Sequence, residues 1–213
     1  MDFQTLGSRV KLLLNEDPSV VNYYLSADLS AVINLANYDI CRETLGIEST
    51  GSVNTVSGTY EYGLSASYMT NNQHLAIRGV FYNTFQLQLV SVDDVCWQYG
   101  DTRPLGDPQK YMIWNNLIIL DKTPQEAKEL KIFFYKKPAT LVDNTATPEL
   151  GDEYHMAIVY LAAAYLTVKD KDKLEESTFY QRYLFLISRL KSLKMSYDSF
   201  KIPLDPYLER GRR

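Results

Sequence analysis

The chain has little cysteine and little histidine, with two of each among its 213 residues. Cys41 and Cys96 lack metal-ligand spacing and allow at most one disulfide, so we expect two reduced, buried thiols. His74 lies in a polar turn, where an exposed side chain is expected, and His155 lies in the first turn of a predicted helix. This scarcity predicts a protein without a metal site or a cofactor.

Catalytic motifs are absent as well. The chain contains no phosphate-binding glycine loop, no H-E-x-x-H pattern and no nucleophile elbow. Glu153 and His155 are not expected to act as a catalytic acid–base pair, because residues so close in sequence point to different faces of a helix. Asp93 and Asp94 diverge in an extended chain and fit solvated charge or a helix cap better than a glycosidase pair. The sequence therefore predicts a structural part rather than an enzyme.

Positive charge is not in excess: the chain has 22 Lys and Arg residues and 26 Asp and Glu residues, which gives a net charge of −4. With a pI near 5.3, the chain is not expected to grip nucleic acid over a broad face. Long apolar runs are missing too: the longest, Met156–Leu166, is too short to span a bilayer, and no signal-like segment opens the chain. We expect a folded, soluble protein of the cytosol, with no membrane association.

Apolar residues recur at helical spacing near the N-terminus. They predict a first helix that ends before Pro18 and a second that runs from Ser26 to about Gly46. The two apolar faces consist of Phe3, Leu6, Val10 and Leu13, and of Leu29, Ile33, Ala36 and Ile40.

Two further helices with matching apolar stripes are predicted near the C-terminus, with Asp152 placed to cap the first. The stripes are Tyr154, Ile158, Leu161, Tyr165 and Val168 in the first helix, and Phe179, Tyr183, Leu186, Leu190 and Leu193 in the second. Because only a short charged turn joins the helices, we expect an antiparallel hairpin.

Between about residues 47 and 141 the pattern changes to short apolar runs with a period of two, broken by Gly, Asn and Asp. Phe85, Leu87 and Leu89 alternate with glutamines, as in a strand with one buried and one wet face. This region predicts a β subdomain inserted between the helices.

A tight hairpin is predicted around the pair Asn115-Asn116, because asparagine tolerates the positive φ of a primed turn. Its strands would be Tyr111–Trp114 and Leu117–Leu120, and Leu130–Tyr135 would add another strand.

The predicted fold class is α+β, with a helical core of about four helices, an inserted small β subdomain and an extended C-terminal tail. The predicted parts are residues 1–46 for the N-terminal helices, 47–147 for the inserted β subdomain, 148–196 for the C-terminal helical hairpin and 197–213 for the tail.

Pro203 and Pro206 prevent the tail from forming one continuous helix, and the tail is too apolar for a solvated linker. Its basic residues outnumber its acidic ones: Lys201, Arg210, Arg212 and Arg213 stand against Asp205 and Glu209. We interpret it as a segment that folds on a partner, burying apolar residues and pairing arginines with carboxylates. The alternative is a tail that packs back on its own domain.

Several short motifs occur together in one order along the chain. They are Leu29-x-x-x-Ile33-Asn34-x-Ala36-Asn37, Val80-Phe81-Tyr82-Asn83, the Tyr111–Leu120 hairpin, Phe134-Tyr135-Lys136-Lys137-Pro138-Ala139, Pro148-Glu149-Leu150 before Glu153-Tyr154-His155, and the alanine-rich helix Val159–Tyr165. With these motifs, nearly the whole chain resembles the head-to-tail adaptor (connector) proteins of tailed bacteriophages, which sit beneath the portal.

The resemblance implies a structural virion protein of the neck, between portal and tail. About twelve copies would form a ring around a DNA channel, and DNA would pass without sequence-specific binding. Expected partners are further copies of the chain, the portal protein, and tail or neck proteins. The tail would supply the portal contacts, through Phe200, Ile202, Leu204, Tyr207, Leu208, Arg210, Arg212 and Arg213.

Other roles remain open at this point. A tail-tube or tail-terminator component would bind tail parts without the portal. A monomeric module would bind a carbohydrate or peptide through tyrosines of the β subdomain, and a hydrolase with an unrecognised site has less support still.

Overall fold

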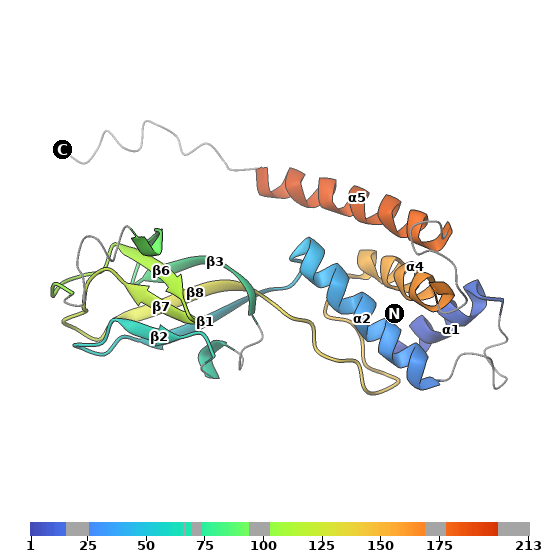
Figure 1. Ribbon diagram of the computed structural model, residues 1–213, viewed down its shortest axis with the longest axis horizontal. Helices are drawn as coiled ribbons and strands as arrows, with labels where there is room; N and C mark the ends of the chain where they lie inside the picture. The colour runs from blue at the N-terminus through green and yellow to red at the C-terminus, as the bar shows by residue number, and fades with distance from the viewer. Residues whose placement is uncertain (16–25, 66, 70–73, 94–102, 169–177, 200–213) are drawn as a thin grey trace. The chain divides into compact units, whose positions relative to one another are not determined.

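The computed structural model describes residues 1–15, 26–65, 67–69, 74–93, 103–168 and 178–199, with side chains of the last range as far as Ser192 (Figure 1). The chain forms two compact units: Met1–Ile40 together with Thr140–Arg213, and Cys41–Ala139. We call them the helical unit and the β unit. Four α-helices and two small sheets occur among the described residues, so the predicted α+β class is confirmed.

All four predicted helices are present. Their bounds are Phe3–Leu13 for α1, Ser26–Thr44 for α2, Asp152–Val168 for α4 and Thr178–Ser199 for α5. In Figure 1 α4 and α5 lie side by side and run in opposite directions, which confirms the predicted antiparallel hairpin. The helix α2 ends two residues before Gly46, at a point where Leu45 takes a left-handed φ of 49°.

The helix α4 is buried on more than its predicted stripe. Ala162, Ala163 and Ala164 are fully buried beside Ile158 and Leu161, because α1 packs against one part of α4 and α5 against another. A helix that is apolar all round belongs in the centre of its unit. At its end the prediction fails for Val168, which is exposed.

The start of α1 is held by side-chain and backbone acceptors. The Asp2 carboxylate accepts a hydrogen bond from Thr5 N at 2.8 Å, and the carbonyls of Ala146 and Asn144 accept from Phe3 N and Gln4 N. These acceptors satisfy amide groups that a helix N-terminus otherwise leaves unpaired. They also fix the segment before α4 against the start of α1.

Asn34 anchors the chain where it enters the helical unit for the second time. Its Oδ1 accepts from Leu141 N at 2.8 Å, and its Nδ2 donates to Leu141 O at 3.1 Å and to Ser30 O at 3.0 Å. The amide therefore satisfies both backbone groups of Leu141, which has no helix or strand to do so.

The β unit consists of two four-stranded sheets that enclose one core. One sheet has the order β1 (Glu48–Asn54), β8 (Glu129–Lys136), β3 (His74–Tyr82) and β4 (Phe85–Gln86); the other has β2 (Glu61–Gly63), β7 (Leu117–Leu120), β6 (Lys110–Trp114) and β5 (Gln88–Leu89). All pairs are antiparallel except β5 with β6. Side chains from both sheets fill the core, among them Val80, Tyr82, Ile118, Ile132 and Phe134.

The predicted hairpin and the predicted strand before residue 136 are confirmed. Asn115 and Asn116 connect β6 to β7 with φ values of 46° and 62°, the positive values that a primed two-residue turn requires. The strand β8 lies in the middle of its sheet, between β1 and β3.

The single strand predicted through Phe85, Leu87 and Leu89 is wrong. The chain passes from one sheet to the other at this point: β4 pairs with β3, and β5 pairs with β6. Leu87 lies between them in the core, whereas Phe85 is 71% and Leu89 58% exposed. Both strands lie at sheet edges, where each has a neighbouring strand on one side only.

Two smaller expectations also fail. His74 is half-buried and begins β3, opposite Lys136, so it does not lie in an exposed turn. Asp152 is the first residue of α4 rather than the residue before it, and its carboxylate contacts the N-terminus and His155.

Candidate interaction surfaces

The predicted portal contacts lie outside the described residues. This applies to Phe200, Ile202, Leu204, Tyr207, Leu208, Arg210, Arg212 and Arg213 alike. The described structure ends with α5, so the surfaces considered below belong to residues before position 200.

A pocket of about 440 Å³ lies in the β unit, where β3 turns into β4. Phe85, Leu87 and Pro108 supply apolar surface, and Tyr82 and Lys128 supply polar groups. The turn between β3 and β4 places Phe85 there, since Asn83 takes a left-handed φ of 55° and donates from its N to Glu129 O at 2.7 Å. Pockets of this size are typical of sites that receive a side chain or small group.

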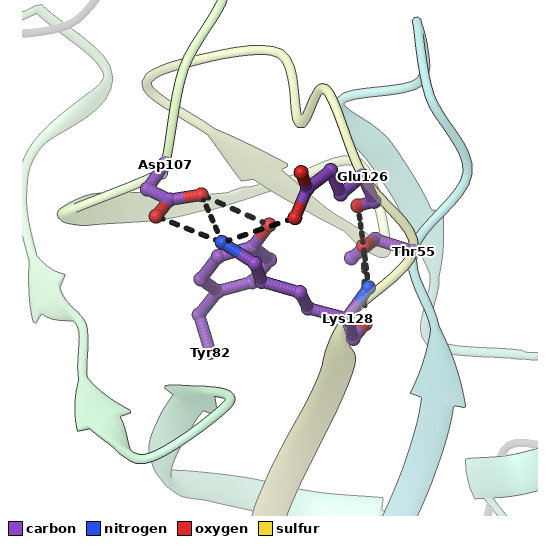
Figure 2. A network of polar contacts seen from close by, with 5 residues as sticks. All are labelled: Thr55, Tyr82, Asp107, Glu126 and Lys128. Carbon is purple, nitrogen blue, oxygen red and sulfur yellow. Dashed lines mark hydrogen bonds and ion pairs between the residues drawn. The ribbon is translucent and has the colours of Figure 1, made fainter.

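Lys128 and Asp107, two of the residues that line this pocket, form an ion pair, which Figure 2 shows with its polar neighbours. Lys128 Nζ lies 2.8 and 2.9 Å from the two carboxylate oxygens of Asp107, and Glu126 Oε2 lies 3.9 Å away. The Tyr82 hydroxyl donates to Asp107 Oδ1 at 3.4 Å, and the Lys128 ammonium lies 5.6 Å from the centre of the Tyr82 ring. Two carboxylates therefore flank the Lys128 ammonium, and the charge of Lys122 also lowers the pKa of Asp107.

The backbone that carries Lys128 is held by a buried threonine. Thr55 Oγ1 accepts a hydrogen bond from Lys128 N at 3.0 Å. The same hydroxyl donates toward two carbonyl oxygens, Lys128 O at 3.0 Å and Glu126 O at 3.2 Å. The hydroxyl thus ties the residue after β1 to the residues before β8 and fixes where the Lys128 side chain starts.

The charges of the Lys128–Asp107 ion pair are stabilised by one another. The hydrogen bond from Lys128 lowers the pKa of Asp107, and that carboxylate raises the pKa of Lys128. Burial raises the pKa of Tyr82, and the negative charge of Asp107 raises it further. At neutral pH the pair is ionised and the phenol is protonated, so the pocket presents fixed charge rather than a group poised to exchange protons.

His155, which was not expected to act as an acid–base pair with Glu153, has a structural role. His155 is buried, its Nε2 lies 3.2 Å from Leu150 O, and its Nδ1 lies 2.6 Å from the Met1 ammonium and 3.1 Å from Asp152 Oδ1. Burial, and then the nearby ammonium, lower the pKa of His155. The neutral ring can accept at Nδ1 and donate at Nε2, so it links the N-terminus to α4.

Metal-ligating residues do not gather in the described parts of the chain: no three His, Cys, Asp or Glu side chains there could hold an ion. No described helix is long and apolar enough to cross a membrane. Cys41 is buried on α2 with a reduced thiol whose Sγ lies 3.3 Å from Lys136 O, as predicted, and Cys96 lies outside the described residues.

The Phe85 pocket was not among the sites predicted from the sequence. Asp107 and Lys128 are 21 residues apart in the chain, and only the folding of two loops brings them together. The one local signal was the Asn83-Thr84 turn before Phe85, which separates it from the core residues of β3.

Comparison with known proteins identifies the family. A search of curated proteins finds no match. The family model described as SU10 adaptor protein matches residues 1–201, which is nearly the whole chain. Such adaptors are structural components of the phage virion and interact with other head and tail proteins, as the resemblance implied. The chain belongs to the SU10 adaptor protein family.

Proposed function

We propose that this chain is the adaptor that joins the portal to the tail, as a ring of about twelve copies around the DNA channel. The observation that carries the proposal is the match to an adaptor family over residues 1–201. The ring lies in the neck of the virion, and viral DNA passes through it during ejection. No catalytic step is assigned to the chain.

The charge of the chain supports a conduit. A net charge of −4 gives DNA phosphates no broad attractive surface, so DNA slides rather than binds. Affinity for DNA would slow each genome that passes.

The tail, residues 197–213, docks on the portal in this proposal. It combines apolar side chains with three arginines, the residue types that bury surface and pair with carboxylates at interfaces. The helices of residues 1–46 and 148–196 form the body of the ring, and the β subdomain of residues 47–147 is available to tail or neck proteins.

The test is to mix the full chain with the portal oligomer of the same virus. Measurement of mass and electron-microscopic images should show a stoichiometric second ring on the tail-facing end of the portal. A chain that binds tail parts and ignores the portal would instead identify a tail-tube or tail-terminator component.

A deletion from Phe200 onward tests the tail separately. The shortened chain should fold, as judged by circular dichroism, and should no longer join the portal. Normal joining by the shortened chain removes the tail from the mechanism, although the adaptor role would stand.

A further inference from the structure

Two exposed phenylalanines have no role in the described fold. Phe85 at the β-unit pocket is 71% exposed, and Phe185 on α5 is 62% exposed. Aromatic residues are enriched at protein interfaces, so exposed phenylalanines are candidate contact residues. The surroundings of the two rings indicate what each one contacts.

The surface around Phe85 presents two exposed carboxylates. The side chains of Asp107 and Glu126 are 66% and 76% exposed, whereas that of Lys128 between them is 28% exposed, and Lys122 lies near enough to lower the pKa of Asp107. Leu87 and Pro108 add apolar surface to the pocket beside the ring. This surface suits a partner that brings an apolar side chain together with a positive charge.

The surface around Phe185 is positive. Arg182, Phe185 and Arg189 are exposed and follow one another at spacings of three and four, so they share one face of α5. The opposite face carries Tyr183 and Ile187, which are buried in the helical unit. From position 178 to 192 the sequence contains no Asp or Glu.

We propose that these two surfaces bind each other between copies of the chain. Phe185 of one copy enters the pocket beside Phe85 of a second copy, and Arg182 and Arg189 approach the carboxylates of Asp107 and Glu126. Offset or edge-to-face packing of the rings and charge-assisted hydrogen bonds from arginine to carboxylate stabilise such a contact.

This contact joins unlike surfaces, so every copy keeps one free helix face and one free pocket for its next neighbours. Repetition of a head-to-tail contact produces a ring when the rotation closes. The inference therefore rests on the proposed function for its setting and names the surfaces that hold the ring together.

The first test compares Phe85→Ser and Phe185→Ser in the full chain. Self-association, measured by sedimentation in solution and by ring formation on the portal, should weaken about tenfold or more in each variant, as expected for an aromatic anchor. Leu12→Ser is the matched control, because Leu12 is 67% exposed and lies on α1. Loss in only one of the two phenylalanine variants overturns the pairing.

The second test reverses charge. Glu126→Arg, beside the pocket next to Lys128, and the double variant Arg182→Glu with Arg189→Glu on α5 should each weaken self-association, and mixing the two should restore it. Mixing restores the contact only if the two surfaces meet, because the reversed charges then face each other across the interface. Absence of restoration overturns the proposal.

The outcomes separate this inference from the adaptor role. A normal ring of the phenylalanine variants on the portal refutes the interface and leaves the adaptor role intact. Self-association that depends on both phenylalanines in a chain that ignores the portal supports the interface and refutes the adaptor role. A chain that stays monomeric in solution and on the portal refutes the interface.

Discussion

Gly51 of β1 is a position where one methyl group should destabilise the β unit. A Cβ atom at this residue would lie 2.1 Å from the carbonyl oxygen of Tyr68 and 3.3 Å from Met69 Sδ. Real Cβ atoms do not come within 3.0 Å of other heavy atoms, so the short 3₁₀ helix Ser67–Met69 would have to move by about 1 Å.

That 3₁₀ helix is held at two points. Met69 is fully buried in the core of the β unit, and the Tyr68 hydroxyl donates to Gly63 O at 2.7 Å. Moving the segment gives up part of the burial of Met69 and strains or breaks the hydrogen bond. We expect Gly51→Ala to lower the free energy of unfolding by about 2–4 kcal/mol.

Gly79 of β3 provides the matched control, since it is also a buried glycine of the same sheet. A Cβ there would meet Gln86 Nε2 at 3.5 Å and Phe81 at 3.8 Å, which are ordinary contacts. Gly79→Ala should leave stability unchanged or raise it by up to about 1 kcal/mol, because alanine restricts the unfolded chain.

Tryptophan fluorescence during urea unfolding is the appropriate measurement. Both tryptophans, Trp97 and Trp114, belong to Cys41–Ala139, so their emission reports on the β unit. Equal midpoints for the two alanine variants would refute the reasoning, because the close contacts with Tyr68 and Met69 occur at Gly51 and not at Gly79.

Three further outcomes are expected. Asn34→Ala removes the hydrogen bonds to both backbone groups of Leu141 and should lower the stability of the helical unit by about 2–3 kcal/mol, measured by circular dichroism. Thr55→Val leaves Lys128 N without its acceptor and should cost about 1–3 kcal/mol by tryptophan fluorescence. The lowered pKa of His155 means that the unfolded chain binds the proton more readily. Stability is then retained above the unfolded-state pKa of about 6.5 and lost as pH falls below it, and His155→Gln should flatten this dependence.

The helices were predictable because their apolar residues repeat over several turns. The stripe of α4 from Tyr154 to Leu161 is buried as expected, and the antiparallel packing of α4 on α5 followed from the shortness of their connection. The burial of Ala162 to Ala164 was not predictable in the same way, because small residues fit both a buried and an exposed face.

In the β unit, the hairpin could be predicted because the conformational preference of its turn residues determines the structure. Asn115 and Asn116 adopt positive φ without help from the rest of the fold, so their hairpin is visible in the sequence. The strands they connect, β6 and β7, are apolar without alternation. Both faces carry buried residues, Tyr111 and Ile118 on one and Met112 and Ile119 on the other, although Ile113 and Trp114 at the hairpin end are exposed.

Phe85 and Leu89 show where period-two spacing fails to predict the structure, and the failure has a physical cause. Period-two spacing states which side chains share a face of a strand, but it cannot state that the strand stops and changes sheets at Leu87. Once the sheets separate there, the apolar residues on either side of Leu87 reach the surface at two sheet edges. Polar residues at positions 85 and 89 would suit the fold equally well, yet the chain has Phe and Leu there. Such departures from the pattern of buried apolar and exposed polar residues concentrate at functional sites. By this argument the mistaken strand is itself the evidence that first points to the Phe85 pocket as a contact surface.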